Sequence, residues 1–201
     1  MQRSEKFRLS SCSRSYETRD MTQPGPTISR VDLPGDCDPT LRQAYVTAMA
    51  RTAAAVTVVT TDGAAGRFGQ TVSAATSVTA DPPTLLVCLY RATAAAEAVL
   101  ANGCFAVNVL GPADRAVSDV FAGRGAVGER YAFDDAWRTA RTGSPVRPDV
   151  PAAFDCVLSH TLIVGTHVVC VGRVVAATSS AVEGLTYRDR GYGRHLPEPR
   201  S

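Results

Sequence analysis

The stretch GQTVSAATSVTADPP, residues 69–83, decides the fold, and apolar strand-like segments lie on both sides of it. Small residues separate its five hydroxyl side chains, which are Thr71, Ser73, Thr76, Ser77 and Thr79. Small side chains let a ligand approach the backbone, and hydroxyls with free backbone N–H groups bind anionic or carbonyl oxygens. An ordinary half-buried strand would carry bulkier β-branched and aromatic residues. The segment therefore predicts a strand that ends in a small-molecule cradle.

The segments around this cradle predict an antiparallel sheet. VTVVTT (residues 56–61) is typical of a strand, Asp62–Gly66 of a turn, and the chain from about residue 67 to 79 of the strand that returns. Thr84–Tyr90 is almost continuously apolar, so we expect a strand buried on both faces. The other expected strands are Phe105–Leu110, Phe154–Val164, Thr166–Ala177 and Leu185–Tyr192.

Three helices are expected between these strands. The first begins at Asp38-Pro39 and places Leu41, Tyr45 and Met49 on one stripe, which we expect to be buried. The others run over residues 93–102 and from residue 112 to about 121. This order favours a mainly β fold, an antiparallel barrel with helical decorations, over a doubly wound sheet.

Composition indicates one globular domain. The chain has 201 residues, of which 45% are apolar and 20% charged, and a net charge of +2 that is too small to indicate nucleic-acid binding. No apolar run reaches the roughly 18 residues that span a bilayer, and no secretory signal is visible, so we expect no membrane partner. We expect a domain over residues 38–196 with a C-terminal tail over 197–201 and a disordered tail over 1–37, unless the natural start is Met21.

The six cysteines indicate no redox function. Four of them lie in apolar strand-like runs, where a free cysteine behaves as a small hydrophobic residue; these are Cys88, Cys104, Cys156 and Cys170. No C-x-x-C pair occurs, and a disulfide framework is expected mainly in small secreted domains. We therefore expect the reducing cytoplasm as the compartment.

Several apparent motifs carry little chemistry. Residues 123–128 match G-x-G-x-x-G, but a helix precedes them where a dinucleotide site needs a strand, so we expect a loop. The histidines lack the neighbours that a metal site needs, and His160 fits a core or edge position. His167 differs, because it starts a strand after Gly165-Thr166 and can project into a cavity mouth as a hydrogen-bond donor.

Two further positions leave alternatives open. Asn108 lies in a buried strand and must satisfy several hydrogen bonds, either with a neighbouring loop or with the edge of a ligand. Arg91 and Thr93 at a helix start form either an anion site or a solvated arginine beside an N-cap threonine.

Seven segments occur in order and at suitable spacings, and together they resemble the short-chain flavin reductases, the reductase components of two-component flavin-dependent monooxygenases. They are AMARTAAAVTVVTT (residues 48–61), GQTVSAATSVTADPP (69–83), TLLVCLYRAT (84–93), FAVNVL (105–110), FAG (121–123), GTHVVCVGRVV (165–175) and YRDRGYGRHL (187–196). The resemblance implies an FMN-binding split β-barrel of antiparallel Greek-key type, usually a homodimer with the flavin near the subunit interface.

The resemblance also assigns residues to the flavin and nicotinamide. It implies that the flavin contacts come from Thr71, Val72, Ser73, Ala74, Ser77, Arg91, Ala92, Thr93, Asn108 and Phe121, with the phosphate at residues 91–93. His167 matches the histidine beside the nicotinamide, and Tyr192 and Arg194 lie in the segment that approaches the pyridine nucleotide. The family commonly has Gly-Asp-His where this chain has Gly165-Thr166-His167, so His167 lacks that charge partner.

The implied activity is NADH-dependent reduction of FAD or FMN, with release of the dihydroflavin to a partner oxygenase. The cofactors carry the hydride transfer, and the protein supplies stacking, orientation and electrostatics. His167 would orient the nicotinamide and tune its charge without being an obligatory proton donor. Two alternatives remain, a non-catalytic flavin carrier and a relative of pyridoxine phosphate oxidase, although the latter would need a richer basic phosphate site. The residues leave open FMN against FAD and NADH against NADPH.

Overall fold

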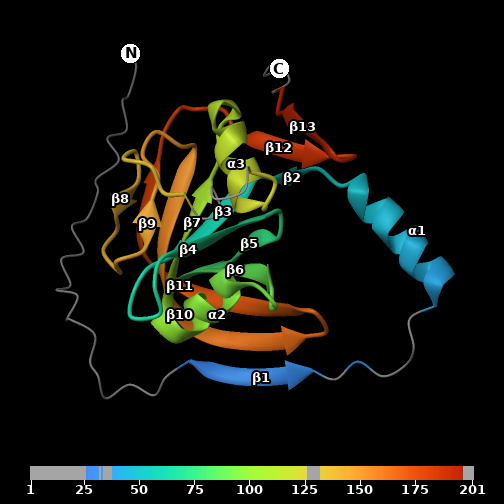
Figure 1. The fold of residues 1–201 in the computed structure, drawn as a ribbon, viewed down its shortest axis with the longest axis horizontal. Coiled ribbons are helices and arrows are strands. Elements are labelled where there is room, and N and C mark those ends of the chain that lie inside the picture. The colour runs from blue at the N-terminus through green and yellow to red at the C-terminus, as the bar shows by residue number, and fades with distance from the viewer. Residues whose placement is uncertain (1–25, 32, 34–37, 126–131, 197–201) are drawn as a thin grey trace, which may run out of the picture.

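The fold is a mainly antiparallel β-barrel with helices outside it, and the computed structural model describes residues 26–31, 33, 38–125 and 132–196 (Figure 1). The strand order of the main sheet is β4-β3-β7-β10-β11-β6-β5. Its strands are β3 (Thr57–Thr61), β4 (Phe68–Val72), β5 (Ala75–Ala80), β6 (Pro83–Tyr90), β7 (Cys104–Val109), β10 (Ala152–Val164) and β11 (His167–Ser179). The expected split-barrel fold is confirmed.

The sheet closes on itself between β4 and β5. These strands stand at opposite ends of the strand order, yet only Ser73 and Ala74 separate them along the chain. The predicted hairpin of β3 with β4 is confirmed, but the expected single strand over residues 67–79 is wrong. The chain leaves β3 after Val72 and pairs next with β6, where the N–H of Cys88 donates to the carbonyl of Ala74 at 2.9 Å. This change of partner converts an open sheet into a barrel.

Strands β10 and β11 form the longest hairpin, and register shifts bend it near Cys156 and His160. The first half of β10 pairs with β7, and its second half pairs in parallel with β1 (Thr27–Val31). The tail was expected to be disordered over residues 1–37, so strand β1 corrects that prediction for five residues. Backbone pairing, not side-chain burial, accounts for β1, because all five of its side chains are exposed. Residues 1–25, 32, 34–37 and 197–201 lie outside the described part of the chain.

Two apolar cores fill the molecule. The first lies inside the barrel and includes Val87, Leu89 and Phe105, and the second lies beside it around Val58, Phe121 and Trp137. Burial along β6 alternates, so the expectation that this strand is buried on both faces is wrong. Leu85, Val87 and Leu89 face the barrel interior, whereas the outward Thr84, Leu86 and Cys88 are only half-buried.

Two predicted helices pack against the barrel. Helix α2 (Ala94–Asn102) begins at Thr93, whose hydroxyl accepts from the N–H of Ala96 at 3.2 Å, and ends at Gly103 with φ of 67°. The segment from Pro112 is a 3-10 turn, η1 (Pro112–Asp114), that continues into α3 (Arg115–Phe121). Helix α3 precedes Gly123, which agrees with the loop predicted there, although residues 126–131 are outside the described chain.

Helix α1 (Pro39–Ala50) begins at Asp38 as predicted, but its apolar stripe is not buried. Leu41, Tyr45 and Met49 are 66%, 63% and 48% exposed, and Figure 1 shows α1 standing clear of the barrel. The spacing predicted the helix correctly, whereas burial requires a partner surface that the chain's own barrel does not supply. No helix in the described part of the chain combines the length and apolar content needed to cross a bilayer.

The C-terminal segment is a hairpin and not the single strand that was expected. Strands β12 (Leu185–Arg188) and β13 (Gly191–Arg194) form a small sheet with β2 (Ala54–Ala55). Asp189 and Arg190 form the turn with φ of 49° and 63°, as a two-residue turn between twisted strands requires. The fully buried Leu185 fixes the start of the hairpin through backbone bonds with Leu110 and Val56.

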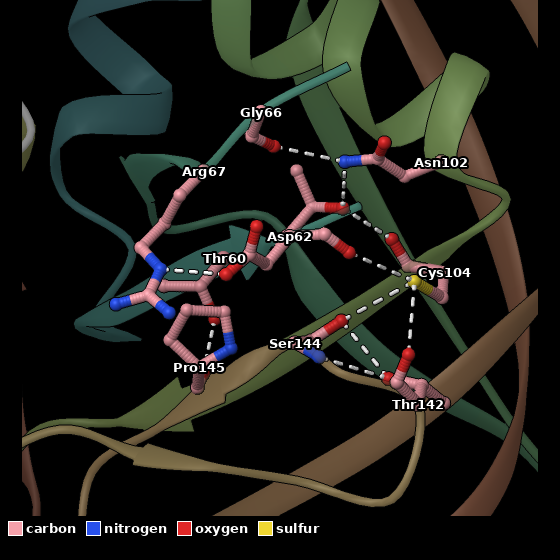
Figure 2. Close-up of polar contacts among 10 residues, drawn as sticks. Thr60, Asp62, Gly66, Arg67, Asn102, Cys104, Thr142, Ser144 and Pro145 are labelled. Carbon is pink, nitrogen blue, oxygen red and sulfur yellow. Dashed lines mark hydrogen bonds and ion pairs between the residues drawn. The ribbon is translucent and has the colours of Figure 1, made fainter. Parts of the chain in front are cut away.

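A polar network around Cys104 fastens the loops at one end of β3 and β7 (Figure 2). The Cys104 Sγ lies 3.5 Å from the hydroxyl of Ser144 and 3.7 Å from the carbonyl of Asp62. Thr60 donates to the carbonyl of Pro145, which ties β3 to the hairpin of β8 (Arg138–Thr139) and β9 (Pro145–Val146). Cys104 therefore has a structural role.

The other described cysteines are free thiols as well, as the sequence predicts. Cys156 and Cys170 lie fully buried in the barrel core. Burial raises the pKa of each of these thiols to about 12, because a low-dielectric interior disfavours the thiolate.

Replacing Gly172 by Ala should destabilise the barrel. A Cβ at this position would lie 2.5 Å from Cζ of Phe105, a fully buried ring with little room to move. We expect Gly172→Ala to lower the free energy of unfolding by about 1–3 kcal/mol, measured by urea denaturation. Gly184→Ala is the control, because no heavy atom lies within 4 Å of its Cβ. Equal stabilities of the two variants would contradict this packing.

Candidate functional site: a pocket at the closure of the barrel

A pocket of about 240 Å³ lies where β4, the end of β6 and the end of α3 meet. It is lined by Gly69, Gln70, Thr71, Tyr90, Thr93, Val120, Phe121, Ala122 and Gly123. Three of these, Thr71, Thr93 and Phe121, were predicted as flavin contacts. The structure therefore brings together residues from three segments that are distant in the sequence.

Hydrogen bonds between the walls fix the shape of this pocket. The hydroxyl of Thr71 donates to the carbonyl of Ser118 at 2.7 Å, which joins β4 to α3. The hydroxyl of Thr93 lies 2.9 Å from Oε1 of Gln70, which joins β4 to the start of α2. A hydroxyl has one proton and two lone pairs, so Thr71 presents an acceptor to any ligand in the pocket.

An aromatic cluster supports the wall formed by Phe121. The ring of Phe121 lies 5.0 Å from that of Phe133 and 5.6 Å from that of Trp137, both edge to face. On its other side the ring abuts Gly69, where a Cβ would lie 2.8 Å from it. Phe121 is only 4% exposed, so its position is set by packing on both sides.

His167 lies at the rim of the same pocket, because its ring contacts that of the lining residue Tyr90. The two residues pair across β6 and β11, and their rings meet edge to face at 5.7 Å. The hydroxyl of Thr166 lies 3.0 Å from Nδ1 of His167, so Nε2 is the ring nitrogen left for a ligand. The side chain is exposed, in agreement with its expected position at a cavity mouth.

The predicted phosphate segment lies at this rim, Thr93 is the N-cap of α2, and an anion site at Arg91 stays a prediction. Arg91 and Ala92 are exposed, and the N–H of Arg91 donates to the carbonyl of Thr166 at 3.0 Å. Thr93 is an N-cap residue whose hydroxyl also lies 2.9 Å from the carbonyl of Tyr90. Thr93 therefore caps α2 and also lines the pocket. Arg91 is the positively charged residue that precedes this helix in the sequence.

The cradle residues divide by exposure. Ser73 and Ala74, at the closure of the barrel, and Ser77, on β5, are exposed. Val72 is 8% exposed and packs in the barrel core, so it can offer a ligand only its backbone.

Asn108 does not line the pocket, which corrects its prediction as a flavin contact. The residue is fully buried, and its side-chain N–H groups lie 3.2 Å from the carbonyl of Val58 and 3.2 Å from the hydroxyl of Thr60. Its Oδ1 accepts from the N–H of Arg147 at 2.8 Å. The amide therefore joins β3, β7 and the segment after β9, which is the loop-partner alternative.

Tyr192 and Arg194 lie on β13 and are not among the residues that line the pocket. Arg194 is exposed. The hydroxyl of Tyr192 is directed at α3, within 2.7 Å of Oδ1 of Asp119. The structure thus separates both residues from the pocket wall.

Sequence reasoning missed six of the lining residues: Gly69, Gln70, Tyr90, Val120, Ala122 and Gly123. Each is within two positions of a predicted residue, and the FAG segment (residues 121–123) already marked two of them. The missing signal was three-dimensional, because nothing local indicates that α3 faces β4.

Other sites are less suited to a ligand. A larger hollow of about 860 Å³ is lined by residues of α1 and its C-cap Arg51, so it lacks an opposing wall. Within the described residues, no group of three or more His, Cys, Asp or Glu side chains is arranged to hold a metal ion.

Comparisons with known proteins agree with the sequence resemblance. The family model described as flavin reductase like domain matches residues 49–195. A curated protein of Ancylobacter novellus, FMN reductase (NADH) RutF, is 49% identical over 152 residues, which cover 75% of this chain and 83% of that protein.

Solved structures give the same result. BorF, the flavin reductase component of a bacterial two-component tryptophan halogenase, matches with a TM-score of 0.68 and 29% identity over 79% of this chain and 99% of BorF. The NADH:FAD oxidoreductase SgcE6 of Streptomyces globisporus, solved with NAD and FAD fragments, matches with a TM-score of 0.72 and 25% identity over 83% of this chain and all (100%) of SgcE6.

Replacing Gly69 by Ala should distort the pocket. The added Cβ would lie 2.8 Å from the ring of Phe121, which Trp137 and Phe133 hold from behind. We expect at least a tenfold weaker binding of FMN, measured by quenching of flavin fluorescence. Gly184→Ala again serves as the control, and unchanged FMN binding in Gly69→Ala would contradict the assignment of this pocket.

Proposed function

This chain belongs to the flavin reductase-like family, and on that basis we propose that it is an NADH:flavin oxidoreductase. The observation that carries the proposal is the pocket at the barrel closure, where Thr71 and Phe121 lie beside the His167 rim. The curated relative from Ancylobacter novellus is named for NADH-dependent reduction of FMN. We therefore propose FMN as the preferred flavin, with FAD as a second substrate because SgcE6 uses it.

The residues present fit a flavin. A volume of about 240 Å³ is smaller than most drug-sized pockets, so it suits a ring system whose side chain continues over an open surface. The exposed Ser73, Ala74 and Ser77 provide such a surface without bulky groups. The acceptor oxygen of Thr71 suits an N–H group at the edge of the flavin ring. The guanidinium of Arg91 at the rim suits the flavin phosphate.

The protein's own contribution is to bind and orient the two substrates. The bound nicotinamide and flavin supply the redox chemistry, a hydride transfer from C4 of the nicotinamide to N5 of the isoalloxazine. The walls exclude water through Phe121 and the aromatic cluster behind it. The ring of Tyr90 and Nε2 of His167 would orient the nicotinamide at the rim. Proximity accounts for most of the rate, because a transfer between positioned rings needs no strong acid or base.

We propose that reduced flavin leaves the protein for a flavin-dependent oxygenase. The support is the similarity to BorF, a component of a two-component system. The four free thiols fit a reducing compartment such as the cytoplasm.

The direct test is to mix the purified protein with NADH and catalytic FMN in air-saturated buffer, where dioxygen reoxidises the dihydroflavin, and to follow the NADH absorbance against a sample without protein. Multiple turnovers are expected, and NADPH and FAD in parallel assays give the preferences. A protein that quenches FMN fluorescence but does not oxidise NADH would be a flavin carrier, and the proposed activity would be wrong.

His167→Ala should impair use of NADH more than binding of flavin. Loss of one hydrogen bond at the rim predicts a decrease of about tenfold in kcat/KM for NADH, with the dissociation constant of FMN within about twofold of the wild type. His160→Ala is a matched control, because His160 is also exposed but pairs with β1 away from the pocket. Equal losses for NADH and FMN would mean that His167 is structural.

We also propose that the protein is a homodimer in which α1 packs on a second copy. The stripe of Leu41, Tyr45 and Met49 is apolar and exposed, and Val78 on β5 is 53% exposed. Contiguous apolar patches on a soluble surface usually mark an interface, and the chain's own barrel leaves this stripe uncovered.

Placing a charge on this stripe should dissociate the dimer. We expect Tyr45→Glu to give a monomer in analytical ultracentrifugation, because a carboxylate would be buried without a partner. Gln43→Glu adds the same charge on the opposite flank of α1 and should leave the dimer intact. A wild-type protein that sediments as a monomer would refute the proposed assembly.

A further inference from the structure

The C-terminal hairpin of β12 and β13 lies next to α3 (Figure 1). The hydroxyl of Tyr192, on β13, makes the contact between them. This hydroxyl lies 2.7 Å from Oδ1 of Asp119 and 3.0 Å from Oγ of Ser118. A phenol has one proton and a carboxylate only accepts, so Tyr192 donates to Asp119. The hydroxyl of Ser118 then donates to Tyr192, and both contacts bind β13 to the same turn of α3.

That turn of α3 is part of the pocket. The carbonyl of Ser118 accepts from the hydroxyl of Thr71 at 2.7 Å, and the pocket wall begins two residues later at Val120. Helix α3 ends at Phe121, and Gly123, two residues later with φ of 73°, is the last residue of this wall. A shift of α3 would therefore move the wall and Thr71 together.

The hairpin has fixed attachments of its own. At its base the N–H of Leu185 donates to the carbonyl of Leu110 at 2.8 Å, and at its turn the N–H of Asp189 donates to the carbonyl of Ala50 at 2.6 Å. The hairpin is thus anchored to the barrel and to the end of α1 independently of α3. It can serve as a support against which α3 is held.

The ring of Tyr192 is held separately from its hydroxyl. It packs edge to face on Tyr187 at 5.4 Å, and the guanidinium of Arg115 lies 5.8 Å above it. Burial is the main cause that raises the pKa of Tyr192, so the hydroxyl keeps its proton at neutral pH. Replacement by Phe would remove the two hydrogen bonds and keep the ring contacts.

We propose that Tyr192 is a positioning residue for the flavin pocket, acting through Asp119 and Ser118 on α3. We assign it no direct bond to the nicotinamide, because its hydroxyl already binds Ser118 and Asp119. The proposal rests on the proposed flavin reductase function, and flavin binding without NADH provides a readout that is independent of turnover.

The test compares Tyr192→Phe with the wild type in FMN titrations and in steady-state kinetics. We expect the dissociation constant and the KM of FMN to rise about tenfold, which is the effect of one charge-assisted hydrogen bond, with kcat and the KM of NADH within about twofold. Ser159→Ala is the control for loss of a hydroxyl, because it removes a hydroxyl that donates to the carbonyl of Val171 at 2.9 Å, between β10 and β11. A rise in the KM of NADH with unchanged FMN binding would overturn the proposal in favour of direct nicotinamide contact.

A double-mutant cycle tests the route through Asp119. Asp119→Ala should weaken FMN binding to a similar extent, and the double variant should be no weaker than either single variant, because the contact is already lost. Additive losses would overturn the route through Asp119. If the wild type binds no FMN at all, the proposed function itself fails. If the wild type binds FMN and the Tyr192→Phe variant binds it equally well, only the proposed role of Tyr192 fails.

Discussion

The architecture depends on the closure of one sheet between β4 and β5. Two residues, Ser73 and Ala74, carry the chain from one end of the strand order to the other. The chain connection and not a ladder joins these two ends, because β4 pairs with β3 and β5 with β6, and the rim must admit a backbone change of direction there. Small residues meet that requirement and also leave room above the rim. The site is therefore located where the fold needs its smallest side chains.

Local signals predicted most elements correctly. The caps at Asp38, Thr93 and Gly103 place helix ends within a residue or two, because capping depends on neighbours in the sequence. The break at residues 73–74 and the turn at 189–190 were not predicted, because strand partners are chosen over long sequence distances. The burial of α1 was wrongly predicted for a related reason. An amphipathic stripe specifies that some surface covers it and not which surface does.

The residues of the candidate site also divide into those that local sequence signals identify and those whose role depends on distant partners. Thr71, Thr93 and Phe121 were identified from their segments, and the pocket unites them. Asn108 was assigned to the pocket from the resemblance, but its hydrogen bonds go to Val58, Thr60 and the segment of Arg147, which no local pattern relates to it. What distinguishes a ligand contact from a structural one here is the set of partners that already satisfy the side chain.

The deeply buried thiols bear on the proposed release of dihydroflavin. Free dihydroflavin reacts with dioxygen, and hydrogen peroxide is the product of that side reaction. Peroxide oxidises the thiolate form of cysteine, and burial raises the pKa of Cys156 and Cys170 well above neutral pH, so both remain thiols. The barrel interior would thus keep these two sulfurs resistant to the by-product of uncoupled turnover.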